Sequence, residues 1–174
     1  MRIVGGKFAG RDLVSPNDFR VRPTAEFVRT AMLDGLADVV KGARILDLFA
    51  GTGALGLEAL SRGAASADFV ETRGSSLHAL KANIALLRLR ERTRVFRKDA
   101  LPFAAALKEA SYDIAFVDPP YESRMLDRVI EGWQVTGFSR ILVVEHTSRH
   151  ALPPGALVKR FENTSVSFYG MRRR

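Results

Sequence analysis

From Lys41-Gly42 onward, short apolar runs alternate with segments whose apolar residues have helical spacing. The apolar runs predict strands, and the segments between them predict helices. Strands that are apolar throughout, rather than at every second residue, are typical of a parallel sheet with helices on both faces. The predicted strands are 44–49, 67–71, 94–96, 114–117 and 141–144, and the predicted helices between them are 54–62, 75–87, 103–108 and 123–132.

The beginning of the chain departs from this alternation. Segments 2–4 and 12–14 are extended and flank glycines, which predicts a small hairpin. Arg22-Pro23-Thr24 then predicts the start of a helix. Its expected apolar stripe is Phe27, Val28, Ala31, Met32 and Gly35 or Leu36.

The end of the chain departs from it too. Segments 156–161 and 165–169 follow Pro153-Pro154-Gly155 with no helix between them, which predicts an antiparallel pair at the sheet edge. We therefore expect one Rossmann-like α/β domain over residues 1–174, with a seven-stranded and mostly parallel sheet. Residues 1–40 would form an N-terminal hairpin and helix extension, and 41–174 the core.

The charge is strongly positive, at +8, and it is clustered. Basic residues gather in the first thirty residues, between Lys81 and Lys98, and in the last sixteen residues. Such clusters favour a polyanionic partner, and a basic surface without a partner is the alternative. The basic residues of the first cluster are Arg2, Lys7, Arg11, Arg20, Arg22 and Arg29.

Composition also excludes several classes of protein. The absence of cysteine excludes disulfides, thiolate zinc sites, iron–sulfur clusters and a cysteine nucleophile. The three histidines, His78, His146 and His150, are too scattered along the sequence to predict a metal site. No apolar run is long enough to span a bilayer and the N-terminus lacks a signal-peptide core, so we expect a soluble cytoplasmic protein.

The fourth apolar run ends in Asp118-Pro119-Pro120-Tyr121. The two prolines stiffen the backbone and exclude helix. The Asp118 carboxylate and the Pro119 carbonyl can accept the hydrogens of an exocyclic amine, and the Tyr121 ring can stack on the base that carries it. The tetrapeptide therefore predicts a site for an amine-bearing base. A proline turn that only closes a buried strand is the alternative.

A glycine-rich run begins on the first predicted strand and continues beyond it: Asp47-Leu48-Phe49-Ala50-Gly51-Thr52-Gly53-Ala54-Leu55-Gly56. Glycines between a strand and a helix let the backbone approach a ligand, and Glu71, at the end of the next strand, is placed to bind ribose hydroxyls. The same glycines also satisfy the dinucleotide pattern of NAD enzymes. A dinucleotide-binding oxidoreductase is therefore one alternative.

Three carboxylates favour S-adenosylmethionine over a dinucleotide. Asp47 can receive a ligand ammonium group, whereas it would repel a pyrophosphate. Asp99, in Lys98-Asp99-Ala100, can accept the adenine amino hydrogens, with a helix N-cap as the alternative. Asp118 ends a strand at the same carboxyl edge, where ligands of open parallel sheets bind. The expected cofactor-binding residues are Asp47, Phe49, Ala50, Gly51, Thr52, Gly53, Glu71, Asp99 and Ala100.

These motifs together resemble the bacterial 16S rRNA guanine-N2 methyltransferase family that modifies guanine 966. The resemblance rests on 47–64, Phe69-Val70-Glu71 and 118–121, and on a similar leader formed by Arg2-Ile3-Val4-Gly5-Gly6, Gly10-Arg11, Arg22-Pro23-Thr24 and Val28-Arg29. Two positions depart from the family pattern. Phe161-Glu162 stands where the family has Tyr-Gly, and no second acid lies near Glu71.

The resemblance implies a class I methyltransferase that uses S-adenosylmethionine without a metal. Its partner would be 16S rRNA within a small-subunit assembly particle, and the enzyme would act as a monomer. Arg2, Lys7, Arg11, Arg20 and Arg22 would contact the RNA, and Asp118, Pro119, Pro120 and Tyr121 would be catalytic.

Other functions stay open at the level of sequence. An adenine-N6 methyltransferase acting on DNA or RNA is the first alternative, because Asp-Pro-Pro-Tyr suits any exocyclic amine. A non-catalytic RNA-binding module is compatible with the charge. His146, next to Glu145 at the end of the fifth predicted strand, could touch substrate or simply be a polar strand end.

Overall fold

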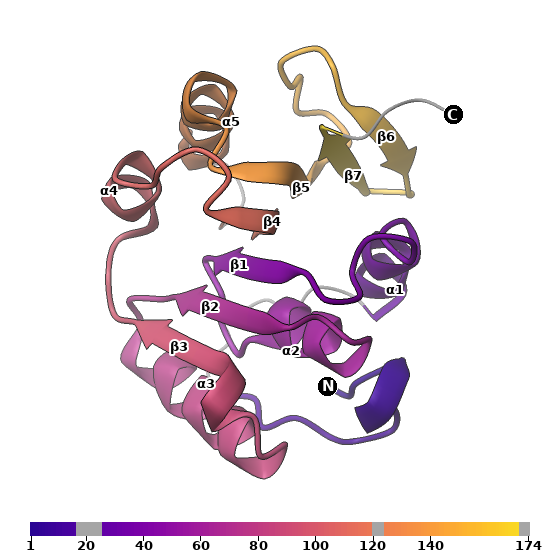
Figure 1. Ribbon diagram of the computed structural model, residues 1–174. Coiled ribbons are helices and arrows are strands. Elements are labelled where there is room, and N and C mark those ends of the chain that lie inside the picture. The colour runs from indigo at the N-terminus through magenta and orange to yellow at the C-terminus, as the bar shows by residue number, and fades with distance from the viewer. Residues whose placement is uncertain (17–25, 120–123, 171–174) are drawn as a thin grey trace.

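A seven-stranded sheet forms the centre of the computed structural model, which describes residues 1–16, 26–119 and 124–170 (Figure 1). The strand order is β3-β2-β1-β4-β5-β7-β6. The first five strands are parallel to one another, and β7 lies antiparallel between β5 and β6. The strands are β1 (Arg44–Leu48), β2 (Ser66–Val70), β3 (Thr93–Phe96), β4 (Tyr112–Val117), β5 (Ser139–Thr147), β6 (Leu157–Arg160) and β7 (Thr164–Tyr169). The predicted mostly parallel sheet with an antiparallel C-terminal strand is confirmed.

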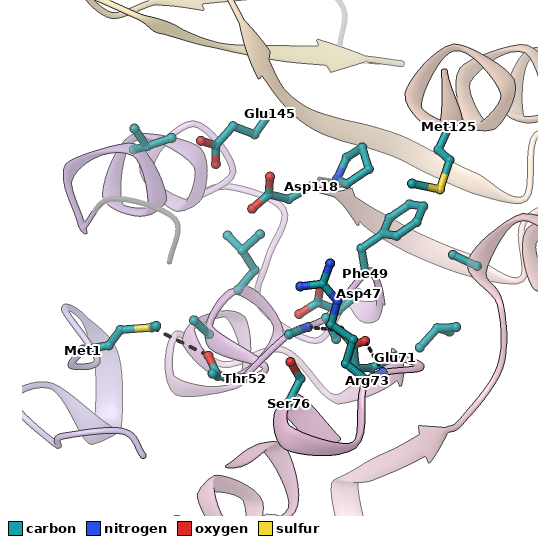
Figure 2. A pocket seen from close by; sticks show the side chains of 18 of the residues that line it. Met1, Asp47, Phe49, Thr52, Glu71, Arg73, Ser76, Asp118, Met125 and Glu145 are labelled. Atoms are coloured by element: carbon teal, nitrogen blue, oxygen red, sulfur yellow. Dashed lines mark hydrogen bonds between the residues drawn. The ribbon is translucent and has the colours of Figure 1, made fainter. Parts of the chain in front are cut away.

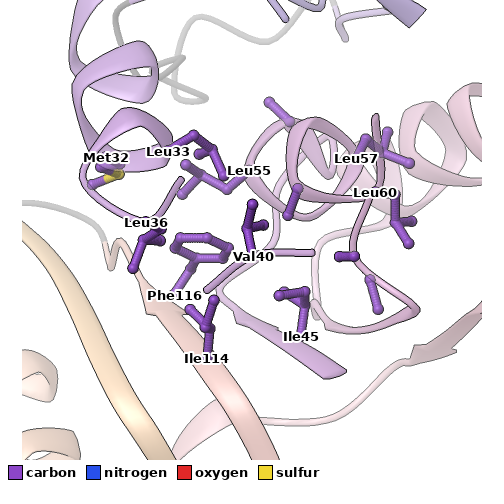
Figure 3. Packing of buried hydrophobic residues seen from close by; sticks show 14 of the residues in the cluster. Met32, Leu33, Leu36, Val40, Ile45, Leu55, Leu57, Leu60, Ile114 and Phe116 are labelled. Atoms are coloured by element: carbon purple, nitrogen blue, oxygen red, sulfur yellow. The ribbon is translucent and has the colours of Figure 1, made fainter. Parts of the chain in front are cut away.

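Helices pack against both faces of this sheet, and together they form two apolar layers (Figure 1). Neighbouring residues of a strand enter opposite layers: Phe116 packs with the first and Val117 with the second. Figure 3 shows part of the first layer, where Phe116 lies among Leu36, Val40 and Leu55. The first layer is covered by α1 (Glu26–Asp34), α2 (Ala54–Ser61) and α3 (Gly74–Leu86), and the second by α4 (Ala100–Ala105) and α5 (Met125–Thr136).

Several boundaries differ from those predicted, and the differences in α4, α5 and β5 have a clear physical reason. Helix α4 begins at Ala100 rather than 103 because the Asp99 carboxylate accepts a hydrogen bond from the Leu101 amide at 3.0 Å and caps the helix. Helix α5 continues to Thr136 and ends where Gly137 adopts φ 59°. Strand β5 runs over nine residues because β7 pairs with its second half.

The beginning of the chain is fixed against α2 by a buried carboxylate. Both oxygens of Glu58 accept backbone amides, Val4 at 2.9 Å and Gly5 at 2.7 Å. The fully buried Arg29 lies 3.7 Å from the same carboxylate and donates to the Arg2 carbonyl at 2.6 Å. The predicted hairpin is present as an isolated antiparallel bridge between Arg2 and Asp12, with the short helix η1 (Gly6–Phe8) between them.

Two expectations about this region were wrong. Arg29 belongs to the basic cluster in sequence, but it is buried against Glu58, so its charge does not contribute to a basic surface. Phe27, expected in the apolar stripe of α1, is 59% exposed, while Val28, Met32, Leu33 and Leu36 form the buried face. Within the described ranges, no helix is long and apolar enough to cross a membrane.

Candidate active site

A cavity of about 710 Å³ lies at the carboxyl ends of the parallel strands. Residues after β1, β2, β3 and β4 line it, together with Glu145 of β5 and the turn between β6 and β7. The strand order reverses between β1 and β4, and this reversal is where open α/β sheets bind ligands.

The sheet edge gathers most of the expected site residues in this one cavity. Gly53 does not line it: an added Cβ there would lie 2.4 Å from Leu80 Cδ1, so this glycine allows close packing behind the loop. Pro120 and Tyr121 lie outside the described residues, as do Arg20 and Arg22. The expected residues that line the cavity are Asp47, Phe49, Ala50, Gly51, Thr52, Glu71, Asp99, Ala100, Asp118 and Pro119.

Asp47 is 2% exposed and accepts the Gly56 amide at 2.9 Å, which fixes the first turn of α2. Burial raises the pKa of this carboxyl well above its usual value, and the nearby Asp118 and Glu71 carboxylates raise it further, while the Gly56 hydrogen bond opposes them. A cationic ligand group would relieve this accumulation of negative charge.

Glu71 holds two loops together. One carboxylate oxygen accepts the Gly51 amide at 2.8 Å, and the other accepts the amides of Thr72 at 2.7 Å and Arg73 at 2.8 Å. The loop after β1 is therefore tied to the loop after β2 at the cavity wall (Figure 2).

The loop after β1 has an unusual backbone. Phe49 has φ 62° and Gly51 has φ 55°, both in the left-handed region. For a non-glycine residue such a conformation costs of the order of 1–3 kcal/mol and is concentrated at binding and catalytic sites. In this turn the Gly51 amide donates to the Glu71 carboxylate at the cavity wall.

Asp99 both lines the cavity and caps α4. The helix N-cap, which was the alternative to an adenine-binding role for Asp99, is therefore present in the structure. Its side chain is exposed, and Ala100 behind it is buried. Capping uses one carboxylate oxygen, Oδ1, for the Leu101 amide.

Asp118 and Pro119 follow β4, and Glu145 lies near the end of the neighbouring β5. Val117 and Val144 are the last paired residues of these two strands, so Asp118 and Glu145 are the next residue of each. Figure 2 shows both carboxylates in the cavity, with Met125 of α5 on the far side of Asp118.

Several lining residues had no place in the sequence interpretation. The Ser76 hydroxyl is the clearest: the residue is 1% exposed, and its Oγ has no hydrogen-bond partner among the described residues. An unpaired buried hydroxyl costs about 1–3 kcal/mol, so a polar ligand group at this wall would be stabilising. Lining carboxylates and this hydroxyl fit a cationic, polyhydroxylated ligand such as S-adenosylmethionine.

An aromatic pair also lines the cavity. Phe27 of α1 contacts Phe161 of the β6–β7 turn edge to face, with ring centroids 5.4 Å apart. Phe161 belongs to the Phe161-Glu162 pair, which stands where the family pattern has Tyr-Gly. Only proximity in the fold reveals this pair, because 134 positions separate its members and neither lies in a recognisable motif.

The remaining candidates lie outside the cavity. Arg2, Lys7 and Arg11 are exposed, and Arg2 lies 3.6 Å from Asp12. His146 is 7% exposed, with Nδ1 2.9 Å from the Thr147 carbonyl oxygen and Nε2 2.9 Å from Ser167 Oγ. His146 does not line the cavity, which agrees with the alternative that it is only a polar strand end. Within the described ranges, no three His, Asp or Glu side chains gather as a metal site would require.

Known proteins share both the sequence and this architecture. A family model described as "Conserved hypothetical protein 95" matches residues 1–170. Ribosomal RNA small subunit methyltransferase D of Escherichia coli is 38% identical over 88% of this chain and 78% of its own length. A putative rRNA methyltransferase of Bacillus subtilis, YlbH, is 34% identical over 88% of this chain and 86% of its own.

A solved structure of a similar protein has the same fold. The putative methyltransferase yhhF from Escherichia coli superposes with a TM-score of 0.83 at 34% identity, covering 97% of this chain and 96% of that one. The expected methyltransferase fold is thereby confirmed, and the oxidoreductase alternative loses its support. The chain belongs to the Conserved hypothetical protein 95 family, which includes the ribosomal RNA small subunit methyltransferase D enzymes.

Proposed function

We propose that this enzyme transfers a methyl group from S-adenosylmethionine to the exocyclic N2 amine of a guanine in 16S rRNA. The observation that carries the proposal is that Asp118-Pro119, at the end of β4, shares one cavity with Asp47, Glu71 and Asp99. Acceptors for an amine therefore lie beside carboxylates suited to a cationic nucleoside.

The residues at the carboxyl ends of β1, β2 and β3 suit the cofactor. Asp47 would face the ammonium group, Glu71 the ribose, and Asp99 the adenine amine, with the backbone of Phe49 to Gly53 against the ligand. When bound, S-adenosylmethionine supplies a methyl group already activated by a sulfonium, so the proposal needs no metal.

The residues after β4 suit the base. The lone pair of guanine N2 is delocalised into the ring, so the amine is a weak nucleophile. The Asp118 carboxylate and the Pro119 carbonyl would accept its two hydrogens and stabilise the positive charge that develops on nitrogen. Pro120 would restrict the backbone freedom of the two acceptors, and Tyr121 would stack on the extruded base. Asp118 then receives the proton that the methylated nitrogen releases.

The charge and the relatives support RNA as the substrate. Two curated relatives at 34–38% identity are named for rRNA methylation. Exposed Arg2, Lys7 and Arg11 lie on the segment that Glu58 fixes beside the site, and Met1 of this segment lines the cavity. Arg20 and Arg22 complete the proposed RNA contact. We propose a single-domain monomer that works in the cytoplasm on a small-subunit assembly particle.

Labelled methyl transfer tests the proposal. Small-subunit particles, naked 16S rRNA and DNA are each offered with S-adenosylmethionine, and the product nucleoside is identified by mass spectrometry. N2-methylguanosine in 16S rRNA is expected. N6-methyladenine in either nucleic acid would favour the adenine alternative, and calorimetric binding of NAD in preference to S-adenosylhomocysteine would contradict the proposed cofactor.

A further inference from the structure

We infer that Glu145 determines the choice of base by accepting the N1–H hydrogen of guanine, while Asp118 holds the N2 amine. The inference rests on the proposed function and deepens it, because Asp-Pro-Pro alone suits the exocyclic amine of adenine equally well. It concerns a residue outside the tetrapeptide and the glycine-rich loop.

The position of Glu145 is fixed by the sheet. It lies inside β5, where the antiparallel ladder pairs it with Val166 of β7. On its other side, β5 is parallel to β4 as far as Val144 and Val117. Glu145 and Asp118 therefore follow paired residues of adjacent strands and extend to the same face, on strands about 4.8 Å apart. Figure 2 shows their carboxylates near each other in the cavity.

Glu145 is buried as well as placed in the cavity. The residue is 6% exposed and lines the same cavity as Asp118. The Thr164 hydroxyl of β7 lies 3.4 Å from its Oε1, which is a long contact for a hydroxyl and a carboxylate. A carboxylate has about four acceptor positions on its two oxygens, so Glu145 can accept a hydrogen from a ligand edge at this wall in addition to its contacts within the protein.

Guanine and adenine differ where Glu145 would meet them. Guanine carries two adjacent donors on one edge, N1–H and the N2 amine, so two neighbouring carboxylates can accept from both. Adenine offers one donor, its N6 amine, beside the N1 lone pair. A carboxylate that faces this lone pair is repelled, so the second acid excludes adenine as well as binding guanine.

The discrimination should be large. Sites built to hydrogen-bond a substrate group reject analogues that lack the group by roughly 10⁴-fold or more. One carboxylate at a cavity wall that remains partly open should give less, and we expect at least about 100-fold. No bond is formed or broken at N1, so Glu145 is a positioning and specificity residue.

The test uses 2-aminopurine, which keeps the amine at C2 but has a lone pair at N1. Small-subunit particles are reconstituted with 16S rRNA that carries either guanine or 2-aminopurine at the nucleotide methylated by the wild-type enzyme. Rates of methyl transfer to the two bases are compared for wild type and Glu145→Gln. 2-Aminopurine also lacks O6, but that difference is the same for both enzymes and cancels in the comparison.

The wild-type enzyme should prefer guanine by at least about 100-fold, and Glu145→Gln by less than about tenfold, because the glutamine amide can turn its NH₂ toward the N1 lone pair. Glu145→Asp keeps the charge and should retain a preference for guanine. The control Glu131→Gln makes the same change on the exposed surface of α5 and should keep the wild-type ratio. Affinity for S-adenosylhomocysteine and Tm show that each variant is folded.

A wild-type ratio in folded Glu145→Gln would overturn the inference and leave the proposed function intact. A wild-type product other than N2-methylguanosine would contradict the proposed function itself and remove the premise of the inference. If Glu145→Gln fails to fold, the same comparison in Glu145→Ala decides: a wild-type preference for guanine in the folded variant would overturn the inference, and loss of most of the preference would support it.

Discussion

The two halves of the cavity are built in different ways. At the carboxyl ends of β1, β2 and β3, the carboxylates of Asp47, Glu71 and Asp99 accept backbone amides of nearby loops and helix starts. After β4 and β5, the wall combines α1, two strand ends and the β6–β7 turn, and Thr164 reaches Glu145 from another strand. The first half is fixed by local hydrogen bonds, whereas the second is assembled from segments far apart in sequence. This difference is consistent with the proposed roles. The first half would bind the cofactor, which is the same in every methyltransferase of this type, and the second would recognise a particular substrate.

Asp118→Ala should give the largest effect and separate the two halves. Methyl transfer should fall roughly 1,000-fold, because an acceptor for the developing charge is lost. Affinity for S-adenosylhomocysteine should change less than about threefold. Single-turnover rates and calorimetry measure the two quantities. Asp113→Ala, at the other end of β4, is the control, and retained turnover in Asp118→Ala would refute the assigned role.

Glu58→Ala tests whether the buried carboxylate fixes the beginning of the chain to α2. It leaves Arg29 buried without its carboxylate and frees the amides of Val4 and Gly5. Loss of one partner of a buried pair costs about 3–5 kcal/mol, so the free energy of unfolding should fall by that amount in urea denaturation. Glu131→Ala, an exposed glutamate, should change it by less than about 0.5 kcal/mol. Equal effects would mean that Glu58 does not fix the leader.

Glu71→Gln should weaken cofactor binding by roughly 10- to 100-fold, since one carbonyl oxygen cannot serve both loops and the ribose. The rate at saturating cofactor should fall far less than in Asp118→Ala. Titration with S-adenosylhomocysteine and the KM and kcat for S-adenosylmethionine distinguish these effects. A variant that loses kcat while keeping its affinity would place Glu71 in the chemical step instead.

The smallest effect concerns pH and Asp47. Burial raises the pKa of Asp47 in the free protein, and a ligand ammonium group favours the ionised form and lowers that pKa. Binding therefore releases a proton, and affinity rises with pH between the pKa of the complex and the higher pKa of the free protein. One proton limits the gain to about tenfold per pH unit. Calorimetry in buffers of different ionisation enthalpy should detect this release in wild type and not in Asp47→Asn.

The half of the cavity that is fixed by local hydrogen bonds is also the half that the sequence predicts more completely. The glycine-rich run, Glu71 and Asp99 lie at successive strand ends, so a strand-and-helix pattern was sufficient to bring them to one edge. The sequence does not show that Asp47 accepts the Gly56 amide and Glu71 the Gly51 amide, because these hydrogen bonds depend on loop conformation.

The non-local half was predicted less completely. The position of β7 between β5 and β6 places Thr164 beside Glu145. The spacing of apolar residues in the sequence does not predict this strand order. The sequence predicts Glu145 and His146 at the end of the fifth strand, near the edge that carries Asp118, but it does not show that Glu145 rather than His146 lines the cavity. The sequence predicts Arg29 as part of a basic surface, because its partner, Glu58, is 29 positions away in the chain and only the fold brings the two together.

A crystal structure with S-adenosylhomocysteine tests the division of the cavity most directly. The account predicts adenine beside Asp99, ribose at Glu71, and the sulfur directed toward Asp118. Ligand density beside Phe161 and Glu145, with Glu71 and Asp99 uncontacted, would contradict it.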